Sequence, residues 1–377
     1  MKIVIAIDKF KGSATSAQLS LCIRQAILEA LPKAHVISVP IADGGDGTMQ
    51  ALKQILGKRV MVRTVQVDSF LPDKISLFAD YLIDPISHTA YMDLATTCGL
   101  ALVSPLKRNV MMANTSGAGM MISDAIEQGA SHIVLGLGGS ATCDGGLGLL
   151  NCLGFKFLDN KGNALFPAGC NLHAISHIDT ENVNPKLKDT KFTLLTDVDN
   201  PLLGSNGAAA VFAPQKGASP QNVEQLERGF INFIRLMPDG EKIASTRGAG
   251  AAGGVVAGMT AFLNAIIVHG IDWILEKTDF ENTIADAQLI ITGEGRIDQQ
   301  TAMGKAPAGV LRAAQKHDIP VIALCGSIAQ GTDVSRLGFS CVSPVTPSGM
   351  PIEQAMETHT TLKNVKRAIT TIIDNWV

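Results

Sequence analysis

Residues 3–8 read Ile-Val-Ile-Ala-Ile-Asp, and this short run begins the pattern that decides the fold. Five apolar residues ended by an aspartate predict a buried strand at residues 3–7. Apolar residues then recur at helical spacing from Ser16 onward, which predicts an amphipathic helix, and residues 36–40 predict a second strand. Strand, helix and strand in this order are typical of a parallel sheet covered by helices.

The same alternation returns near the end of the chain. Buried strands are predicted at residues 287–292, 321–325 and 339–345. A helix is predicted at residues 306–316, between the first two strands, and a last helix at residues 352–376. Because each end supplies only part of a sheet, we expect both ends to combine in one Rossmann-like three-layer α/β domain with a parallel sheet. This domain comprises residues 1–58 and 286–377.

The middle of the chain, residues 59–285, is expected to form an inserted mixed α/β domain. Short turns separate apolar runs at residues 59–67, 74–82 and 89–94, which predicts an antiparallel meander. Helices are expected at residues 116–128, 146–153, 219–237 and 251–268.

Composition excludes several classes of protein. The chain has 377 residues and a net charge of −3, with no run of basic residues, so a nucleic-acid-binding role is not expected. Seven scattered cysteines without a CxxC pair indicate free thiols in a reducing compartment. The opening strand is too short for a signal peptide, which favours the cytoplasm. Gly258, Thr260 and Asn264 interrupt the longest apolar stretch, so we expect no membrane span.

Residues 136–146, Gly-Leu-Gly-Gly-Ser-Ala-Thr-Cys-Asp-Gly-Gly, form the most informative loop and follow an apolar strand. Glycines let the backbone approach an anion, and the start of a following helix supplies amide donors, so the loop predicts a phosphate site. A tight turn that binds nothing is the alternative. Gly136, Gly138 and Ala141 also match the GxGxxG/A spacing of nicotinamide-dependent dehydrogenases, here of a small hydroxy acid. The chain contains no P-loop GxxxxGK[ST] motif.

Carboxylates stand where several predicted strands end. Asp8 follows the first strand, Asp43 follows the second, and Asp197 follows the strand at residues 192–195. Residues 292–298, Thr-Gly-Glu-Gly-Arg-Ile-Asp, follow a further strand and are expected to form one turn. Because the carboxyl ends of parallel strands meet at one edge of a sheet, Asp8, Asp43 and residues 292–298 are expected to share a site, and Asp197 is a functional candidate at its own strand end. Helix capping and surface ion pairs are the competing explanations.

Taken together, these segments resemble the bacterial glycerate kinase family that lacks a P-loop. The resemblance is carried by residues 8–13, 40–48, 136–146, 200–202, 214–218, 248–254 and 292–298, in order along the whole chain. It implies two α/β domains with the active site in the cleft between them. It also implies transfer of the ATP γ-phosphoryl group to D-glycerate with Mg²⁺, mostly giving 2-phosphoglycerate, although some members make the 3-phosphate.

With this resemblance we assign roles as hypotheses. The catalytic candidates are Asp43, Asp197, Lys11 and Asp8. The candidates for binding substrate are Arg296, Glu294 and Ser116, and Arg296 is suited to clamp a carboxylate with two hydrogen bonds. Candidates for binding the phosphates of ATP are Gly138, Gly139, Ser140, Asp144 and Lys216. The candidate ligands of Mg²⁺ are Asp43, Asp197, Glu294 and Asp298.

The chain departs from the family pattern at four positions. Lys9 stands where serine is common, Asp46 where glutamate is common, Cys143 where asparagine is common and Met120 where glutamate is frequent. Aspartate at position 46 keeps the charge and shortens the reach of the side chain.

Overall fold

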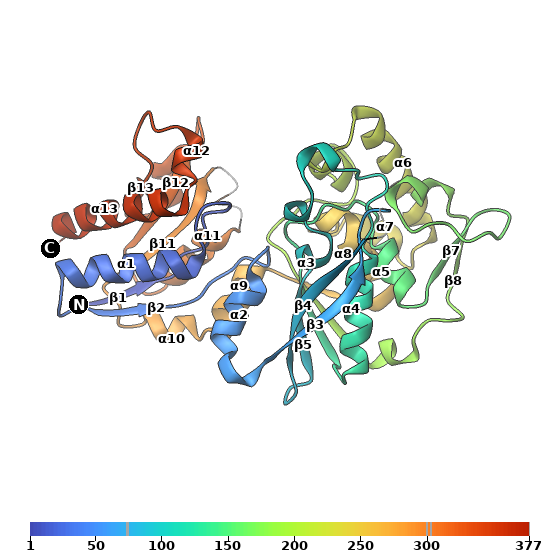
Figure 1. Ribbon diagram of the computed structural model, residues 1–377, viewed down its shortest axis with the longest axis horizontal. Helices are drawn as coiled ribbons and strands as arrows, with labels where there is room; N and C mark the ends of the chain where they lie inside the picture. Colours follow the sequence, from blue (N-terminus) through green and yellow to red (C-terminus); the bar gives the residue numbers. More distant parts are fainter. Residues whose placement is uncertain (73–74, 299–300, 302–303, 377) are drawn as a thin grey trace. The chain divides into compact units, whose positions relative to one another are not determined.

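Strand β1 (Lys2–Ile5) forms at the apolar run that opens the chain, and it lies in a five-stranded sheet (Figure 1). The strand order is β13-β12-β11-β1-β2, and every pairing is parallel. β2 (His35–Ser38) comes from the start of the chain. β11 (Leu289–Ile297), β12 (Val321–Ile328) and β13 (Cys341–Pro344) come from its end. One parallel sheet therefore contains both ends of the chain, as expected.

Helices pack against this sheet on both of its faces. α1 (Ser16–Ala30) and α13 (Thr358–Trp376) lie side by side and bury apolar residues against β1 (Figure 1). α11 (Ala306–Gln315) contacts β11 and β12 outside that apolar cluster, and α10 (Phe280–Ile284) contacts α11. α1 begins with a capping box in which the Thr15 hydroxyl accepts a hydrogen bond from the Gln18 amide.

A second, six-stranded sheet has the order β10-β9-β6-β5-β4-β3. Its strands are β3 (Met61–Asp68), β4 (Ser76–Asp84), β5 (Thr89–Asp93), β6 (His132–Gly136), β9 (Lys191–Leu195) and β10 (Ile266–Val268). β3, β4 and β5 pair antiparallel, which confirms the predicted meander. The other pairings are parallel, so the sheet is mixed.

The helices of this part build one large apolar core. They include α4 (Ser116–Glu127), α5 (Leu147–Cys152), α6 (Pro220–Leu236) and α8 (Ala251–Leu263). α2 (Thr48–Leu56) contacts β4 and β5. The shorter elements include α3 (Ala95–Cys98), α7 (Gly240–Ala244), the antiparallel pair β7 (Lys156–Leu158) and β8 (His177–Asp179), and the single turns η5 (Pro185–Asp189) and η7 (Pro214–Lys216).

The structure describes residues 1–72, 75–298, 301 and 304–376. Tertiary contacts divide the chain into a first unit, Met1–Asp43 with Ile271–Val377, and a second unit, Gly44–Gly270. These divisions differ from the boundaries at residues 58 and 286 that the sequence suggested. α2 groups with the second unit because it packs on β4 and β5, and α10 groups with the first because it packs on α11.

Three elements differ from their predictions: the end of β11, the end of α8 and the last helix. Residues 292–297 are not a turn: they continue β11, and Glu294 pairs with Cys325 of β12. A Cβ atom on Gly293 would lie 2.1 Å from the Leu324 carbonyl oxygen, so this glycine permits close strand pairing. The helix expected at residues 251–268 ends at Leu263, where Asn264 is left-handed (φ 51°), and the β-branched residues beyond it form β10.

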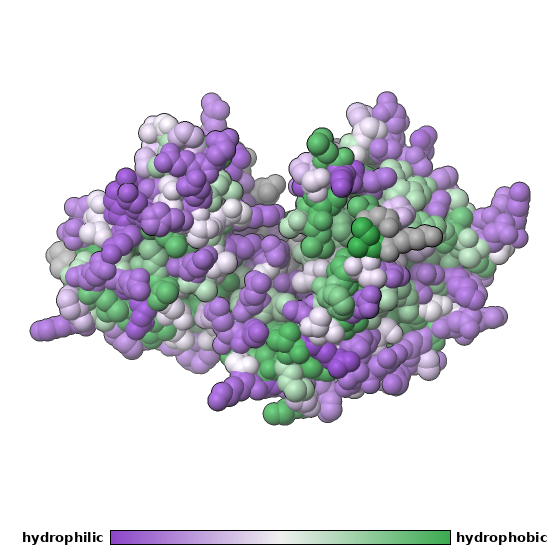
Figure 2. Space-filling view, in the orientation of Figure 1, coloured by the Kyte–Doolittle hydropathy of each residue, from purple (hydrophilic) through white to green (hydrophobic). Residues whose placement is uncertain are grey.

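The expected last helix is divided into α12 (Ile352–Ala355) and α13. Lys74, the first residue of a predicted strand, lies outside the described residues. No helix in the described part of the chain is long and apolar enough to cross a membrane. In the view of Figure 2, hydrophilic residues cover most of the visible surface, and hydrophobic residues form smaller groups among them.

Candidate functional site

The glycine-rich loop after β6 packs tightly in the second unit. The Gly138 amide donates a hydrogen bond to the Gly44 carbonyl oxygen at 3.2 Å. A Cβ atom on Gly138 would lie 2.4 Å from Gly45 Cα, so a larger residue would push the two loops apart. Gly139 has a left-handed backbone (φ 80°) and its carbonyl oxygen accepts from the Leu100 amide. The glycines therefore hold the segment after β6 against the segment after Asp43.

A buried cation lies against this loop. The Lys216 ammonium group donates to the Ser140 hydroxyl at 3.0 Å and to the Thr142 carbonyl oxygen at 2.6 Å. Lys216 is only 3% exposed, and burial lowers the pKa of its ammonium group. Lys216 is therefore not a solvated surface lysine, which the sequence alone would also allow at this turn. Two of the candidates for binding phosphate, Ser140 and Lys216, are thus in direct contact.

Asp144 occupies the helix start at which the sequence analysis placed a phosphate. Its buried carboxylate accepts hydrogen bonds from the amides of Thr115, Gly146 and Gly148 and from the Thr115 hydroxyl. Burial raises the pKa of Asp144, and these bonds oppose that shift. The anion at the start of α5 is therefore the protein's own carboxylate. A direct contact of Asp144 with ATP stays a prediction.

The arrangement also bears on the GxGxxG/A spacing at Gly136, Gly138 and Ala141. In a dinucleotide-binding fold this motif leads directly into a helix. Here residues 137–146 form a longer loop, and α5 begins only at Leu147. The second glycine-rich segment, at the start of α8, packs on the same loop, because a Cβ atom on Gly253 would lie 2.2 Å from the Thr142 carbonyl oxygen. Both runs of glycine serve close backbone packing.

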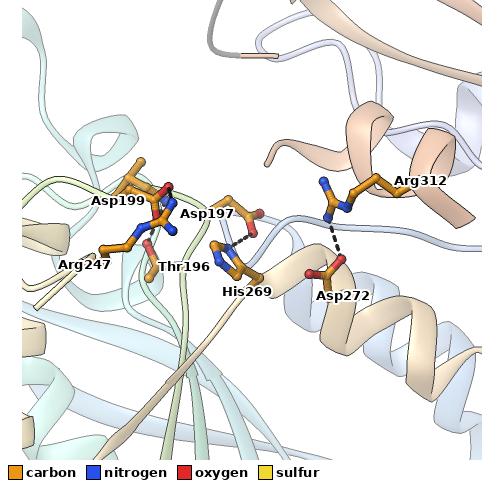
Figure 3. A network of polar contacts seen from close by, with 8 residues as sticks. Thr196, Asp197, Asp199, Arg247, His269, Asp272 and Arg312 are labelled. Carbon is orange, nitrogen blue, oxygen red and sulfur yellow. Dashed lines mark hydrogen bonds and ion pairs between the residues drawn. The ribbon is translucent and has the colours of Figure 1, made fainter. Parts of the chain in front are cut away.

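Asp197 lies just beyond β9, next to a histidine that the sequence did not indicate. Its carboxylate oxygen Oδ1 is 3.9 Å from Nδ1 of His269, which follows β10 (Figure 3). The Asp197 side chain is 7% exposed, whereas that of His269 is 46% exposed. The pair exists because β9 and β10 run parallel and end together. His269 could not be found from its spacing, because the strand before it was predicted as helix.

A further buried carboxylate, Asp93, supports the loop that follows Asp43. It ends β5 and accepts hydrogen bonds from the amides of Gly47 and Met49 at 3.2 Å. These amides belong to the start of α2, where a negative charge is favourable. Asp93 therefore fixes the position of residues 44–48. The signal in the sequence was an aspartate at a strand end, as at Asp8 and Asp197.

In the first unit, three carboxylates influence one another. Asp8 follows β1, and its amide donates to the Gly293 carbonyl oxygen at 3.0 Å. Burial raises the pKa of Asp8 to about 7, and the negative charges of Asp43 and Glu294 add to that rise. Strands β1, β2 and β11 thus bring Asp8, Asp43 and Glu294 to the same edge of the sheet, as the sequence analysis expected.

Lys305 is a cation of this group that the sequence analysis missed. Its ammonium group lies 3.5 Å from Glu294 Oε2 and 3.1 Å from Asp298 Oδ1. The Thr301 hydroxyl donates to Glu294 Oε1 at 2.6 Å. Burial raises the pKa of Glu294, and Thr301 and Lys305 oppose the rise. Lys305 follows Gly304, directly precedes α11 and stands seven residues beyond Asp298, outside the segment that the sequence singled out.

The remaining candidates lie at less buried positions. Lys11 and Arg296 are exposed, and Ser116 is half-buried at the start of α4, where its amide donates to the Asn114 side chain. Of the departures from the family pattern, Cys143 is fully buried, which raises the pKa of its thiol to about 12. The Met120 sulfur accepts a hydrogen bond from the Asp68 amide.

Comparison with known proteins gives one consistent result. The model of the glycerate kinase family matches residues 3–377. A glycerate kinase of Halalkalibacterium halodurans is 37% identical over 99% of this chain and 98% of its own. A glycerate 2-kinase of Escherichia coli is 38% identical over 94% of this chain and 93% of its own. A solved structure from Salmonella typhimurium, described as a glycerate kinase 2, superposes with a TM-score of 0.82 at 33% identity, covering 100% of this chain and 98% of that one.

These matches favour a phosphotransferase over the dehydrogenase that the GxGxxG/A spacing allowed. They cover both units of the chain, including the glycine loop with Lys216 and the carboxylates of the first unit. The chain therefore belongs to the glycerate kinase family, whose members are phosphotransferases.

Proposed function

We propose that the chain transfers the γ-phosphoryl group of ATP to the 2-hydroxyl of D-glycerate, with Mg²⁺. The observation that carries the proposal is the buried Lys216 bound to Ser140 in the glycine loop, in a chain of the glycerate kinase family. The name of the Escherichia coli relative, a glycerate 2-kinase, supports the 2-hydroxyl as acceptor.

Lys216 and the loop from Gly138 to Ser140 are assigned to the phosphates of ATP. Phosphoryl transfer needs positioning and neutralisation of charge more than covalent help from the protein. A buried ammonium group held by two hydrogen bonds is already oriented, so little reorganisation is needed when phosphate oxygens bind. Burial also strengthens its attraction for phosphate, because little water screens the charge.

The acceptor is assigned to the carboxylates at the strand ends and to Arg296. Arg296 offers a planar pair of donors that suits the carboxylate of glycerate. Asp43 or Asp197 accepts the proton of the attacking hydroxyl. His269, with Nδ1 3.9 Å from Asp197 Oδ1, is placed to orient that carboxylate.

The carboxylates of the first unit suit a divalent cation. The negative charges of Asp43 and Glu294 add to the raised pKa of Asp8, and that of Asp43 adds to the raised pKa of Glu294, so a bound cation would relieve this repulsion. Within the described residues, no group of three or more His, Cys, Asp or Glu side chains is arranged to hold a metal. Mg²⁺ commonly takes one or two carboxylates together with phosphate oxygens and water. Asp43 and Asp197, with Glu294 or Asp298, would therefore hold it jointly with ATP, and it would neutralise the transferred phosphoryl group.

Coupled detection of ADP release tests this function. With D-glycerate, ATP and Mg²⁺ we expect sustained turnover, which chelation of the metal with EDTA abolishes. Glycerol is the matched acceptor, because it keeps the hydroxyls and lacks the carboxylate that Arg296 is assigned to bind. Equal ADP release with glycerol and with D-glycerate would contradict the proposed acceptor, and turnover in EDTA would contradict the role of Mg²⁺.

A further inference from the structure

A cavity of about 680 Å³ lies in the second unit at the amino ends of β6, β9 and β10. Its walls come from these strands, from η5 and from the last turn of α8, and they include His132, Lys188, Lys191, Phe262 and Ile266. The residues assigned to catalysis in this unit follow the carboxyl ends of the same strands, as Asp197 does after β9. In open α/β sheets the reaction takes place at the carboxyl ends, so the proposed function gives this cavity no role.

The size and lining of the cavity suit a small molecule. Cavities that hold small ligands usually enclose about 300–1,000 Å³ and combine apolar walls with a few polar groups. Phe262, Leu263 and Ile266 supply an apolar wall. The strand ends supply polar groups: the His132 ring nitrogen Nε2 and the Thr193 hydroxyl share a hydrogen bond of 2.8 Å.

The charges at the cavity favour an anion. Lys188 and Lys191 line it together with a single carboxylate, Glu181. Neither ammonium group forms an ion pair with any residue in the described ranges, so both are available to a ligand. Two lysines without partners beside an apolar wall match a ligand that carries a negative group on a compact apolar body.

We propose that this cavity is a second binding site, for a small organic anion whose carboxylate or phosphate meets Lys188 and Lys191 and whose apolar part packs on Phe262 and Ile266. The site is separate from the one assigned to ATP and glycerate. It does not depend on the identity of the reaction.

Ligand-observed NMR and calorimetry on the full chain test the site. Benzoate and phenyl phosphate serve as probes with carboxylate and phosphate groups, and benzyl alcohol is the uncharged control. We expect at least one anion to bind one to one, about tenfold or more tighter than benzyl alcohol, because charge-assisted hydrogen bonds add to the apolar contact. Benzyl alcohol binding as well as both anions would overturn the assignment to an anion, and no binding by either anion would overturn the site.

Variants locate the binding. The double variant Lys188→Gln with Lys191→Gln is expected to weaken binding of the anion at least about tenfold, because it removes both positive charges. Both lysines are exposed, so their replacement leaves the core intact. Lys161→Gln, at another exposed lysine of the same unit, is the matched control and is expected to bind as the wild type does. Ile266→Trp, at an exposed wall residue, is expected to fill the cavity and to reduce binding further.

Competition separates this site from the catalytic one. Saturation with glycerate and the non-hydrolysable ATP analogue AMP-PNP is expected to leave the anion bound. Displacement of the anion by these compounds, or full affinity in the double lysine variant, would overturn the proposal. If AMP-PNP itself does not bind, the proposed function fails, and the lysine variants still decide the second site.

Discussion

The ammonium group of Lys216 donates a hydrogen bond to the hydroxyl of Ser140, 76 residues earlier in the chain, and both side chains are buried. A buried ammonium group is costly unless it is paired or bound by several acceptors. The two acceptors found here, Ser140 and the Thr142 carbonyl oxygen, are neutral. We infer that the charge is retained for a ligand, and the phosphates of ATP are the ligand that the family suggests.

Replacing Lys216 by methionine tests this role. Methionine keeps much of the side-chain volume and removes the charge, so we expect the protein to fold while kcat/KM for ATP falls about 10- to 100-fold, as for a lost charge-assisted bond to phosphate. Steady-state kinetics with varied ATP measure the effect. Lys242→Met, at an exposed lysine of the same unit, is the control. An unchanged kcat/KM in a folded Lys216→Met protein would remove Lys216 from the ATP site.

Alkaline pH should weaken ATP binding through the same group. The pKa of Lys216 is lowered by burial, so its positive charge is present below that pKa and is lost as pH rises through it. KM for ATP is therefore expected to rise on the alkaline side in the wild type. The measurement is a pH profile of KM in both proteins. If Lys216→Met shows the same alkaline rise, another group is responsible.

Replacing Asp43 or Asp197 by asparagine should lower kcat by at least about a hundredfold, because each change removes a charge assigned to the metal and the hydroxyl. Asp199→Asn is the matched control for Asp197: it lies two residues away and pairs with Arg247, apart from the Asp197–His269 contact (Figure 3). Circular dichroism establishes that the variants fold. Wild-type turnover in both folded variants would refute the assignment.

Gly138→Ala tests whether close loop packing matters for activity. The added methyl group would lie 2.4 Å from Gly45 Cα and would separate the loop after β6 from the loop after Asp43. We expect kcat/KM to fall at least about tenfold, since small displacements of positioning groups reduce phosphoryl transfer strongly. The melting temperature is measured in parallel. Full activity at unchanged stability would show that the packing is not needed for catalysis.

The ion pair between Arg63 and Asp124 of α4 should make the stability of the protein depend on pH in the acid range. The Asp124 carboxylate accepts two hydrogen bonds from Arg63 and one from Tyr81, and the Arg63 guanidinium foremost lowers its pKa. Because the pKa of Asp124 is lowered in the folded protein, the stabilisation is fully present at pH values above the ordinary aspartate pKa of about 3.9. It is lost as the pH falls through the folded-state pKa. Asp124→Asn is thus expected to lower the melting temperature at pH 7, with a smaller difference near pH 3.

The control for that experiment is Asp189→Asn, at an exposed aspartate of the same unit. It is expected to melt within about one degree of the wild type at both pH values, as is usual for surface substitutions. A difference for Asp124→Asn that stays constant between pH 7 and pH 3 would contradict the electrostatic explanation.

Local patterns predicted much of the fold. Apolar runs and helical spacing located β1, α1 and the β3–β5 meander. β1 is buried on both faces and appears as an unbroken apolar run, whereas α1 buries one face and shows it by the period of its apolar residues. The continuation of β11 through residues 292–297 could not be predicted, since glycines at 293 and 295 signal a turn in isolation. Only the neighbouring strand β12 shows that Gly293 is needed for pairing. β10 was missed for a similar reason, because its apolar residues continue those of α8.

The candidate site shows the same limit. Aspartates at strand ends could be found from sequence, and Asp8 and Asp43 do interact. Their partners could not be found: Lys305 lies beside Glu294, and His269 lies beside Asp197. The first contact depends on how the start of α11 folds back toward β11, and the second on how β9 and β10 align, which the local pattern does not contain. Asp144 adds a contact that the sequence did not indicate, since its carboxylate accepts hydrogen bonds from the Gly146 and Gly148 amides at the start of α5.

The most direct test of the central claim is the product formed from D-glycerate, ATP and Mg²⁺. Phosphorus NMR with proton coupling distinguishes the two esters, because the 2-phosphate couples to one carbon-bound proton and the 3-phosphate to two. We expect a doublet from 2-phosphoglycerate that accumulates with ADP. A triplet from the 3-phosphate would contradict the assignment of the 2-hydroxyl, and the absence of any phosphorylated glycerate would contradict the proposed reaction.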